Sequence, residues 1–228
     1  METTMDSLNR GDPKPIFEKY LQALQKGLFN QASQTTQEAL QAGLLPETIY
    51  EEVFTPALRM VGDWWEAGQA TVAQEHLATG ITTYCRNLVY SKHSVALPVS
   101  LSVGKVLLTN IDGNHHTLGL NLLSDVFQWR GWEVFPLFCS LPEEEVAAAT
   151  LLYQVDLVCL SVAVLSQVES AASTIKALRQ SNWEGLIEVG GPAFIHHPEK
   201  ALQTGADFYG QTAIDTVEKA TQLLKARV

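Results

Sequence analysis

The part of the sequence after Gly104 alternates short apolar runs with longer amphipathic stretches, and this alternation limits the possible folds more than any other feature. Strands are predicted at 105–109, 133–137, 157–161, 186–189 and 208–209, and helices at about 116–130, 142–154, 166–181, 196–204 and 211–226. Five strand–helix units in succession predict an α/β fold with a doubly wound, parallel, five-stranded sheet of the flavodoxin-like kind.

The residues before this part have a helical periodicity. Between 15 and 91, apolar side chains recur at spacings of three and four, with breaks near Asn30, Pro46 and Gly68. Such spacing is typical of amphipathic helices, and the breaks divide the segment into four. The predicted organisation is a disordered start at 1–14, a four-helix bundle at 15–91, a linker at 92–103 and the α/β domain at 104–228.

Composition favours a folded, acidic protein of the cytoplasm. The chain has 228 residues, 46% of them hydrophobic, and a formal net charge of −10, which argues against direct binding to nucleic acid. The start is polar, and we expect no membrane span because no apolar run approaches about 18 residues. The cysteines are widely spaced, two of them in apolar strand-like runs, and are expected to be buried free thiols; the three are Cys85, Cys139 and Cys159.

Three strand ends carry residues suited to a large ligand. The loop 114–119 follows the first strand and contains His116 and Gly119, the third strand ends at Ser161–Val162, and the fourth leads into Gly190–Gly191. Ligands bind at the carboxyl edge of such sheets. An imidazole nitrogen suits a transition metal, and glycines let a ligand lie close to the backbone. We therefore expect these loops to converge on one site.

This pattern resembles the cobalamin-binding domain family, over about 104–228. The family motif is an acidic residue, any residue, His, two residues and Gly, followed by a serine at a strand end and a Gly-Gly pair. The resemblance implies that His116 ligates cobalt from below, that the displaced nucleotide tail is buried in the sheet domain, and that Ser161 and Gly190–Gly191 contact it. The chain departs at Asn114, where a carboxylate is usual, and His115 is a rival ligand with less suitable spacing to Gly119.

The helical half resembles light-responsive, adenosylcobalamin-binding transcriptional repressors. The shared pattern is Trp65, nine intervening residues, and then Glu75 and His76. Considered without the sheet domain, Trp65 would be interpreted as a core residue of the bundle. The resemblance implies that it packs on the adenosyl group, with the Glu-His pair beside it. Glu66 stands where the best-known repressors have a second cobalt-ligating histidine, and only about 15 residues precede the bundle, so we expect no DNA-binding domain.

The expected site can be stated residue by residue. The metal ligand is His116, and the cofactor-binding residues are Trp65, Glu75, His76, Asn114, His115, Thr117, Gly119, Ser161, Val162, Gly190 and Gly191. The expected cofactor is cobalamin, as adenosylcobalamin or else methylcobalamin, and a bilin in the bundle is a further possibility.

The resemblance to the repressors makes a stand-alone cobalamin-dependent photoreceptor the leading hypothesis. Light would break the bond between cobalt and carbon and change conformation or oligomeric state, and the signal would pass to a separate regulator of transcription. The alternatives are a corrinoid methyl carrier of a methyltransferase system and a cobalamin storage or escort protein. In each case we expect a homo-oligomer and not an enzyme.

Overall fold

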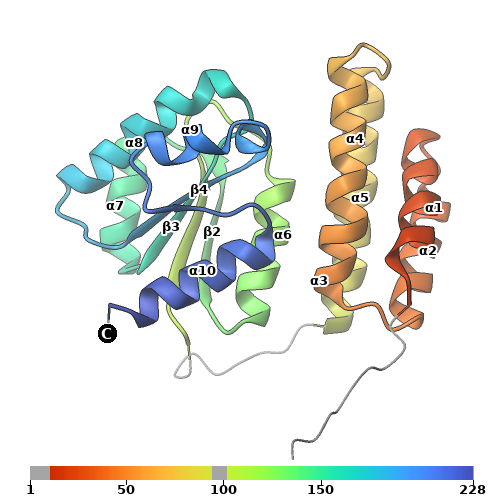
Figure 1. The fold of residues 1–228 in the computed structure, drawn as a ribbon, viewed down its shortest axis with the longest axis horizontal. Coiled ribbons are helices and arrows are strands. Elements are labelled where there is room, and N and C mark those ends of the chain that lie inside the picture. Colours follow the sequence, from red (N-terminus) through yellow and green to blue (C-terminus); the bar gives the residue numbers. More distant parts are fainter. Residues whose placement is uncertain (1–10, 94–101, 228) are drawn as a thin grey trace, which may run out of the picture. The chain divides into compact units, whose positions relative to one another are not determined.

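The protein divides into two compact units in a computed structural model, which describes residues 11–93 and 102–227. The first unit spans Met1–Ser94 and the second Val95–Val228. In Figure 1 the helices of the first unit run from red to yellow, and the elements of the second run from green to blue. Most of the expected disordered start and most of the expected linker lie outside the described residues.

The first unit is a bundle of four helical rods. They are α1 (Pro13–Gln25), α2 (Phe29–Gln41), a continuous rod made of α3 (Pro46–Thr48), η1 (Ile49–Phe54) and α4 (Thr55–Glu66), and α5 (Val72–His93). The rings of Tyr20, Tyr50 and Phe54 pack together inside, and the hydroxyl of Tyr20 donates to Oγ1 of Thr82 at 3.0 Å. The four-helix prediction is therefore confirmed.

Two boundaries of the bundle differ from the prediction. Asn30 lies in the first turn of α2, and the chain turns earlier, at Gly27, which has a φ of +65° that favours glycine. Helix α5 continues to His93, two residues into the segment expected to be a linker.

The η1 segment is a π-helical stretch before Pro56, whose missing N–H removes one helical hydrogen bond.

The second unit is the predicted doubly wound sheet. Its strands are β1 (Lys105–Asn110), β2 (Glu133–Ser140), β3 (Leu157–Ser161), β4 (Leu186–Gly190) and β5 (Phe208–Tyr209), all parallel in the order β2-β1-β3-β4-β5. The helices that connect them are α6 (Leu118–Trp129), α7 (Glu143–Tyr153), α8 (Val168–Gln180), α9 (Pro198–Gln203) and α10 (Ala213–Lys225). Short 3-10 turns, η3 (Leu165–Gln167) and η4 (Pro192–Phe194), precede α8 and α9.

The two faces of the sheet differ in polarity. On one face Leu107, Val158 and Ile187 belong to an apolar core with residues of α7, α8 and α9. On the opposite face, which packs against α6 and α10, the cross-strand row is Leu108, Cys159 and Glu188. Glu188 is only 2% exposed, so this face buries an ionisable group inside the unit.

The cysteine prediction was correct for two thiols and wrong for the third. Cys85 and Cys159 are free and buried, whereas Cys139 is free but exposed, because β2 is an edge strand whose side chains are only partly covered.

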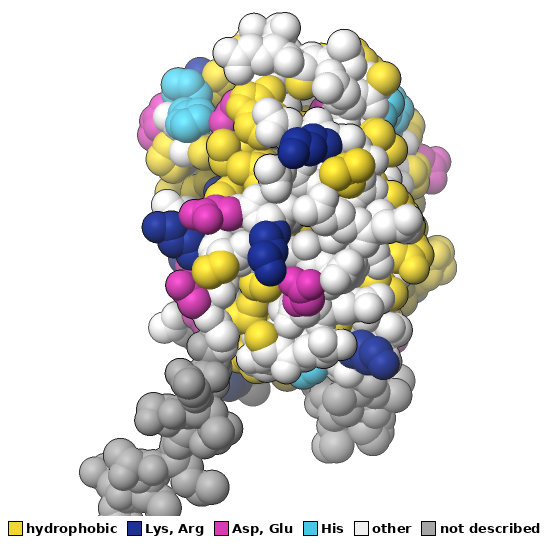
Figure 2. All heavy atoms as spheres, turned by 90° about the vertical axis from the view of Figure 1, so that its right-hand side faces the viewer, with side chains coloured by type: hydrophobic (Ala, Val, Ile, Leu, Met, Phe, Trp, Pro, Cys, Tyr) yellow, Lys and Arg dark blue, Asp and Glu magenta, His cyan; other side chains and the backbone are white. Residues whose placement is uncertain are grey.

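Among the described residues, no helix is long and apolar enough to cross a membrane. Figure 2 shows that the face formed by the bundle carries charged side chains of both signs among uncharged polar ones.

Glu188 should make stability depend on pH. The pKa of its carboxyl is raised to about 8, mainly by burial and also by Asp215, while the Cys159 thiol, the Gly210 amide and Lys219 oppose the shift. The folded state therefore holds a proton that the unfolded chain releases above about pH 4.3. We expect the free energy of unfolding to fall by about 1 kcal/mol per pH unit between pH 5 and 8 because of this group, and to stay lower above pH 8.

The measurement is urea denaturation of the wild type and of Glu188→Gln at several pH values. The variant should show a flatter pH profile, whereas Glu169→Gln, at an exposed position in α8, should follow the wild type. Parallel profiles for the wild type and Glu188→Gln would contradict a buried neutral carboxyl.

Candidate functional site

The candidate site lies at the carboxyl edge of the sheet, where three adjacent strands end. Asn110, the last residue of β1, is in register with Ser161 of β3, and Ser161 is in register with Gly190 of β4. Parallel strands bring the loops that follow them to the same edge. The three loops that were predicted to converge follow neighbouring strand ends in the structure.

Asn114 is the residue that joins the first two of these loops. It is fully buried, and its Nδ2 donates to Oδ1 of Asn110 at 3.1 Å and to the carbonyl oxygen of Ser161 at 2.9 Å, with Oγ of Ser161 at 3.3 Å. A carbonyl oxygen can only accept, so these contacts fix which end of the amide is the NH₂ group. The Oδ1 atom therefore faces the other way, toward His116.

His116 is held by that oxygen. Its backbone N–H donates to Oδ1 of Asn114 at 3.0 Å, and its ring Nδ1 lies 3.2 Å from the same atom. An oxygen that cannot donate requires Nδ1 to carry the proton in the neutral ring, which leaves the lone pair on Nε2. The side chain is exposed. The bond to Asn114 thus leaves Nε2 as the nitrogen that could bind a metal, as when a carboxylate holds a ligating histidine in other metal sites.

The histidine loop is also tied down at Gly113. The amide of Gly113 donates to Oγ of Ser140 at 2.8 Å, at the end of β2, and its carbonyl accepts from Nε2 of Gln167 at 3.0 Å. Oε1 of Gln167 accepts from the backbone of Ala163 at 3.1 Å. Sequence reasoning missed Ser140 and Gln167, because their partners are backbone groups in loops that only the fold brings near.

The glycines of the site have different structural roles. Gly191 has a φ of +113°, and a Cβ there would lie 2.3 Å from the carbonyl oxygen of Val162. A Cβ on Gly190 would lie 2.8 Å from Oε1 of Glu188. At Gly119, in the first turn of α6, a Cβ would meet no atom within 4 Å. The backbone therefore requires glycine at 191, whereas a Cβ at 190 would have to displace the Glu188 carboxyl and a Cβ at 119 would meet open space.

The other predicted residues of this unit take lesser positions. His115 is exposed, and the Asn114 oxygen bonds its neighbour His116. Thr117 is the residue before α6, and its carbonyl accepts from Nδ2 of Asn121 at 2.8 Å. Val162 is buried and donates its N–H to the carbonyl of Gly190 at 2.9 Å, which links the second and third loops.

In the helical unit, Trp65, Glu75 and His76 lie around the turn between α4 and α5. Trp65, in the last turn of α4, is 45% exposed, so it is not the core residue that the simpler interpretation would make it. Glu75, in the first turn of α5, accepts from Oγ1 of Thr79 at 3.0 Å and pairs with Nδ1 of the exposed His76. The pair is thus oriented within its own helix.

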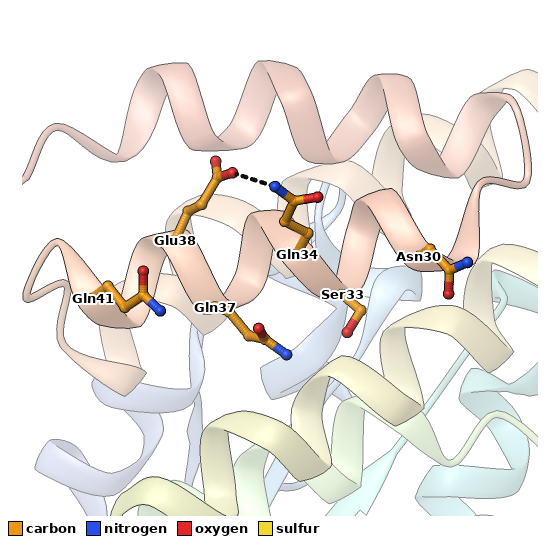
Figure 3. Close-up of a pocket in the computed structure, with 6 residues that line it drawn as sticks. All are labelled: Asn30, Ser33, Gln34, Gln37, Glu38 and Gln41. Carbon is orange, nitrogen blue, oxygen red and sulfur yellow. Dashed lines mark hydrogen bonds between the residues drawn. The ribbon is translucent and has the colours of Figure 1, made fainter.

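A shallow cavity of about 580 Å³ lies elsewhere, along α2 of the bundle. It is lined by Asn30, Ser33, Gln34, Gln37, Glu38 and Gln41. Figure 3 shows these side chains on a single helix, with Nε2 of Gln34 donating to Oε1 of Glu38 at 3.2 Å. Amides and one carboxylate on an open helix face make a solvated surface, so the cavity is not part of the candidate site.

Comparisons with known proteins agree on the ligand class. Two family models, both described as B12 binding domain, match residues 16–84 and 104–218. Trimethylamine corrinoid protein 2 of Methanosarcina acetivorans is 25% identical over 202 residues, which cover 86% of this chain and 90% of that protein. The HTH-type transcriptional repressor CarH of Myxococcus xanthus is 33% identical over 159 residues, 68% of this chain and 51% of the repressor.

A solved structure supports the fold over nearly the whole chain. The monomethylamine corrinoid protein of Methanosarcina barkeri superimposes with a TM-score of 0.76, covering 93% of this chain and 100% of that one at 17% identity. The likeness includes a helical region followed by a five-stranded parallel sheet domain, as in this chain.

Two variants should distinguish Gly191, whose backbone conformation requires glycine, from Gly119, which faces open space. Gly191→Ala should lower the free energy of unfolding by at least about 2 kcal/mol, because it adds a clash with backbone to an unfavourable φ. Gly119→Ala should leave stability unchanged or raise it by up to about 1 kcal/mol, because alanine favours a helix and meets no neighbour. Urea denaturation of the protein without added ligand measures both. Equal losses for the two variants would contradict this division.

Proposed function

The chain belongs to the family of B12 binding domains, and we propose that it is a corrinoid carrier protein in which His116 is the lower ligand of cobalt. The observation that carries the proposal is the hydrogen bond from His116 Nδ1 to Asn114, which leaves Nε2 with its lone pair exposed. Among the described residues, no group of three His, Cys, Asp or Glu side chains could hold a free metal ion. A corrin supplies four nitrogens of its own, so one histidine is sufficient.

The residues of the sheet unit fit this cofactor. Gly119 leaves open space beside the histidine loop, where a flat macrocycle would have to approach the backbone. Ser161 and Gln167, at and after the end of β3, hold the loop through Asn114 and Gly113, so the histidine is positioned before the cofactor arrives. When bound, cobalamin would supply a cobalt ion that can hold a methyl group on its upper face. In this proposal the protein orients the cofactor, and a separate methyltransferase does the chemistry.

The extent of similarity favours a methyl carrier over the light sensor that the sequence analysis placed first. The corrinoid protein of M. acetivorans matches this chain over most of both lengths, whereas the match to CarH covers about half of the repressor. Homo-oligomerisation, a separate effector protein and a bilin in the bundle stay predictions.

A light sensor is the second candidate, because Trp65, Glu75 and His76 favour it. An exposed indole can stack on an adenine ring, and a carboxylate already oriented by Thr79 can accept hydrogen bonds from ribose hydroxyls. Both groups suit an adenosyl ligand better than a methyl group, which is small and apolar.

His116→Ala tests the cofactor site. We expect the wild type to bind hydroxocobalamin with the absorption changes of histidine ligation, and the variant to lose those changes and at least about tenfold in affinity, since it loses the only protein ligand. Asn114→Ala should keep the ligand but weaken binding less, because it removes a positioning partner. His115→Ala is the matched control and should behave as the wild type. If only His115→Ala lost the absorption changes of histidine ligation, the cobalt ligand would be His115 and not His116.

Illumination separates the two candidate functions. A carrier should bind methylcobalamin at least as tightly as adenosylcobalamin in the dark, and green light should leave its mass unchanged in size-exclusion chromatography with light scattering. Trp65→Ala should then change neither affinity by more than about twofold. Selective binding of adenosylcobalamin, a tenfold loss of that selectivity in Trp65→Ala and a change of mass in light would favour the sensor.

A further inference from the structure

Two adjacent histidines in the loop after β1 raise the question of which one the site presents to a metal. His115 and His116 are both exposed, and each imidazole could offer a ring nitrogen. Consecutive side chains outside a helix point in different directions, so the two cannot face the same ligand. The backbone conformation of the loop must therefore select between them.

The histidines follow two successive turns. The N–H of Asn114 donates to the carbonyl of Ile111 at 3.1 Å, and Gly113, the third residue of this first turn, has a φ of +78°, as in a type II turn. Oδ1 of Asn114 then accepts from the N–H of His116 at 3.0 Å, which closes an Asx turn around His115. His116 is thereby tied to Asn114, whereas His115 lies in the middle of the second turn.

Gly113 is held by one side chain from the end of β2 and one from the segment after β3. Its N–H donates to Oγ of Ser140 at 2.8 Å, and that hydroxyl donates in turn to Oδ1 of Asp112 at 3.0 Å. Its carbonyl accepts from Nε2 of Gln167 at 3.0 Å, while Oε1 of Gln167 accepts from the N–H of Ala163 at 3.1 Å. We call the bonds from Ser140 and Gln167 to Gly113 the Gly113 clamp.

The clamp restrains the residue of the loop that has the most backbone freedom. Glycine adopts positive and negative φ at similar cost, so an unclamped Gly113 could rotate and turn the residues that follow it. In the structure the peptide between Gly113 and Asn114 is bonded at both ends, through its carbonyl to Gln167 and through its N–H to Ile111. The direction in which the two histidines leave the turn is fixed with it.

On the basis of the proposed function, we propose that Ser140 and Gln167 select the cobalt ligand by holding Gly113 in the conformation that presents His116. They are positioning residues, because they bond the backbone of the loop and not an imidazole. With the clamp broken, the loop can also present His115, and the two histidines compete for the lower position of cobalt. In the intact protein, the fold keeps His115 away from the metal.

The test asks whether breaking the clamp lets His115 replace a missing His116. Cobalamin is bound to protein made with ¹⁵N-labelled histidine and is reduced to cobalt(II), whose EPR lines are split by the nucleus of a bound nitrogen. The label changes this splitting only when the ligand is histidine, so the nucleotide base cannot be mistaken for it. We expect the labelled splitting in the wild type, none in His116→Ala, and its return when His116→Ala is combined with Gln167→Glu.

Gln167→Glu breaks one bond of the clamp and leaves the loop after β3 intact. An ionised carboxylate still accepts from the amide of Ala163 but cannot donate to the carbonyl of Gly113. With both histidines present, this variant should bind hydroxocobalamin about fivefold more weakly, which is the typical contribution of one hydrogen bond. Ser140→Ala removes the other bond of the clamp and, combined with His116→Ala, should also restore the labelled splitting.

Several outcomes would overturn the inference. The labelled splitting in His116→Ala alone would show that His115 ligates cobalt while the clamp is intact. Its absence from both double variants would show that the clamp only stabilises the loop. Its return with Gln180→Glu in place of Gln167→Glu would show that the added charge and not the clamp is responsible, since Gln180 is exposed at the end of α8.

A third substitution identifies the ligand in the double variants. Adding His115→Ala should abolish the restored splitting, and a splitting that persists would assign it to another histidine and overturn the inference. A wild type that binds no cobalamin, or binds it without the labelled splitting, would overturn the proposed function itself. The outcomes in the variants leave that function standing, so the two failures can be distinguished.

Discussion

The amide of Asn114 is the interaction on which the candidate site depends. Its NH₂ group is committed to Asn110 and Ser161, so its oxygen must face His116. A carboxylate could accept from the histidine but could not donate to the carbonyl of Ser161. Asparagine does both. Asn114 stands where the family pattern usually has a carboxylate. Because its neighbours, Oδ1 of Asn110 and the carbonyl of Ser161, are acceptors, an amide suits this position better than a carboxylate.

Much of the fold could be predicted from the sequence, because each strand is a short apolar run and each helix an amphipathic stretch. The five strands of the sheet lie within three residues of their expected ends. The bundle turn was misplaced at Asn30, since a polar residue in a first helical turn resembles a loop residue, whereas the actual turn depends on a φ that Gly27 alone supplies.

The site was only partly predictable, for a physical reason. His116 and Gly119 belong to a local motif, and local spacing is visible in one sequence. Gln167 and Ser140 act on backbone groups of a distant loop, and Glu188 becomes notable only once its burial on a sheet face is known. Contacts of that kind depend on strand order and register, which a pattern of residue types does not specify.

The two faces of the sheet differ in what they bury. The face toward α7, α8 and α9 is an apolar core, and burial of such side chains is the main favourable term in folding. The face toward α6 and α10 gives up some of that stabilisation to Asn110 and Glu188, each of which needs a partner once buried. Asn110 and Ser161 both bond Asn114, whose oxygen holds His116. Part of the polarity of this face therefore serves to orient one imidazole, and the apolar face makes up for the stability that is lost there.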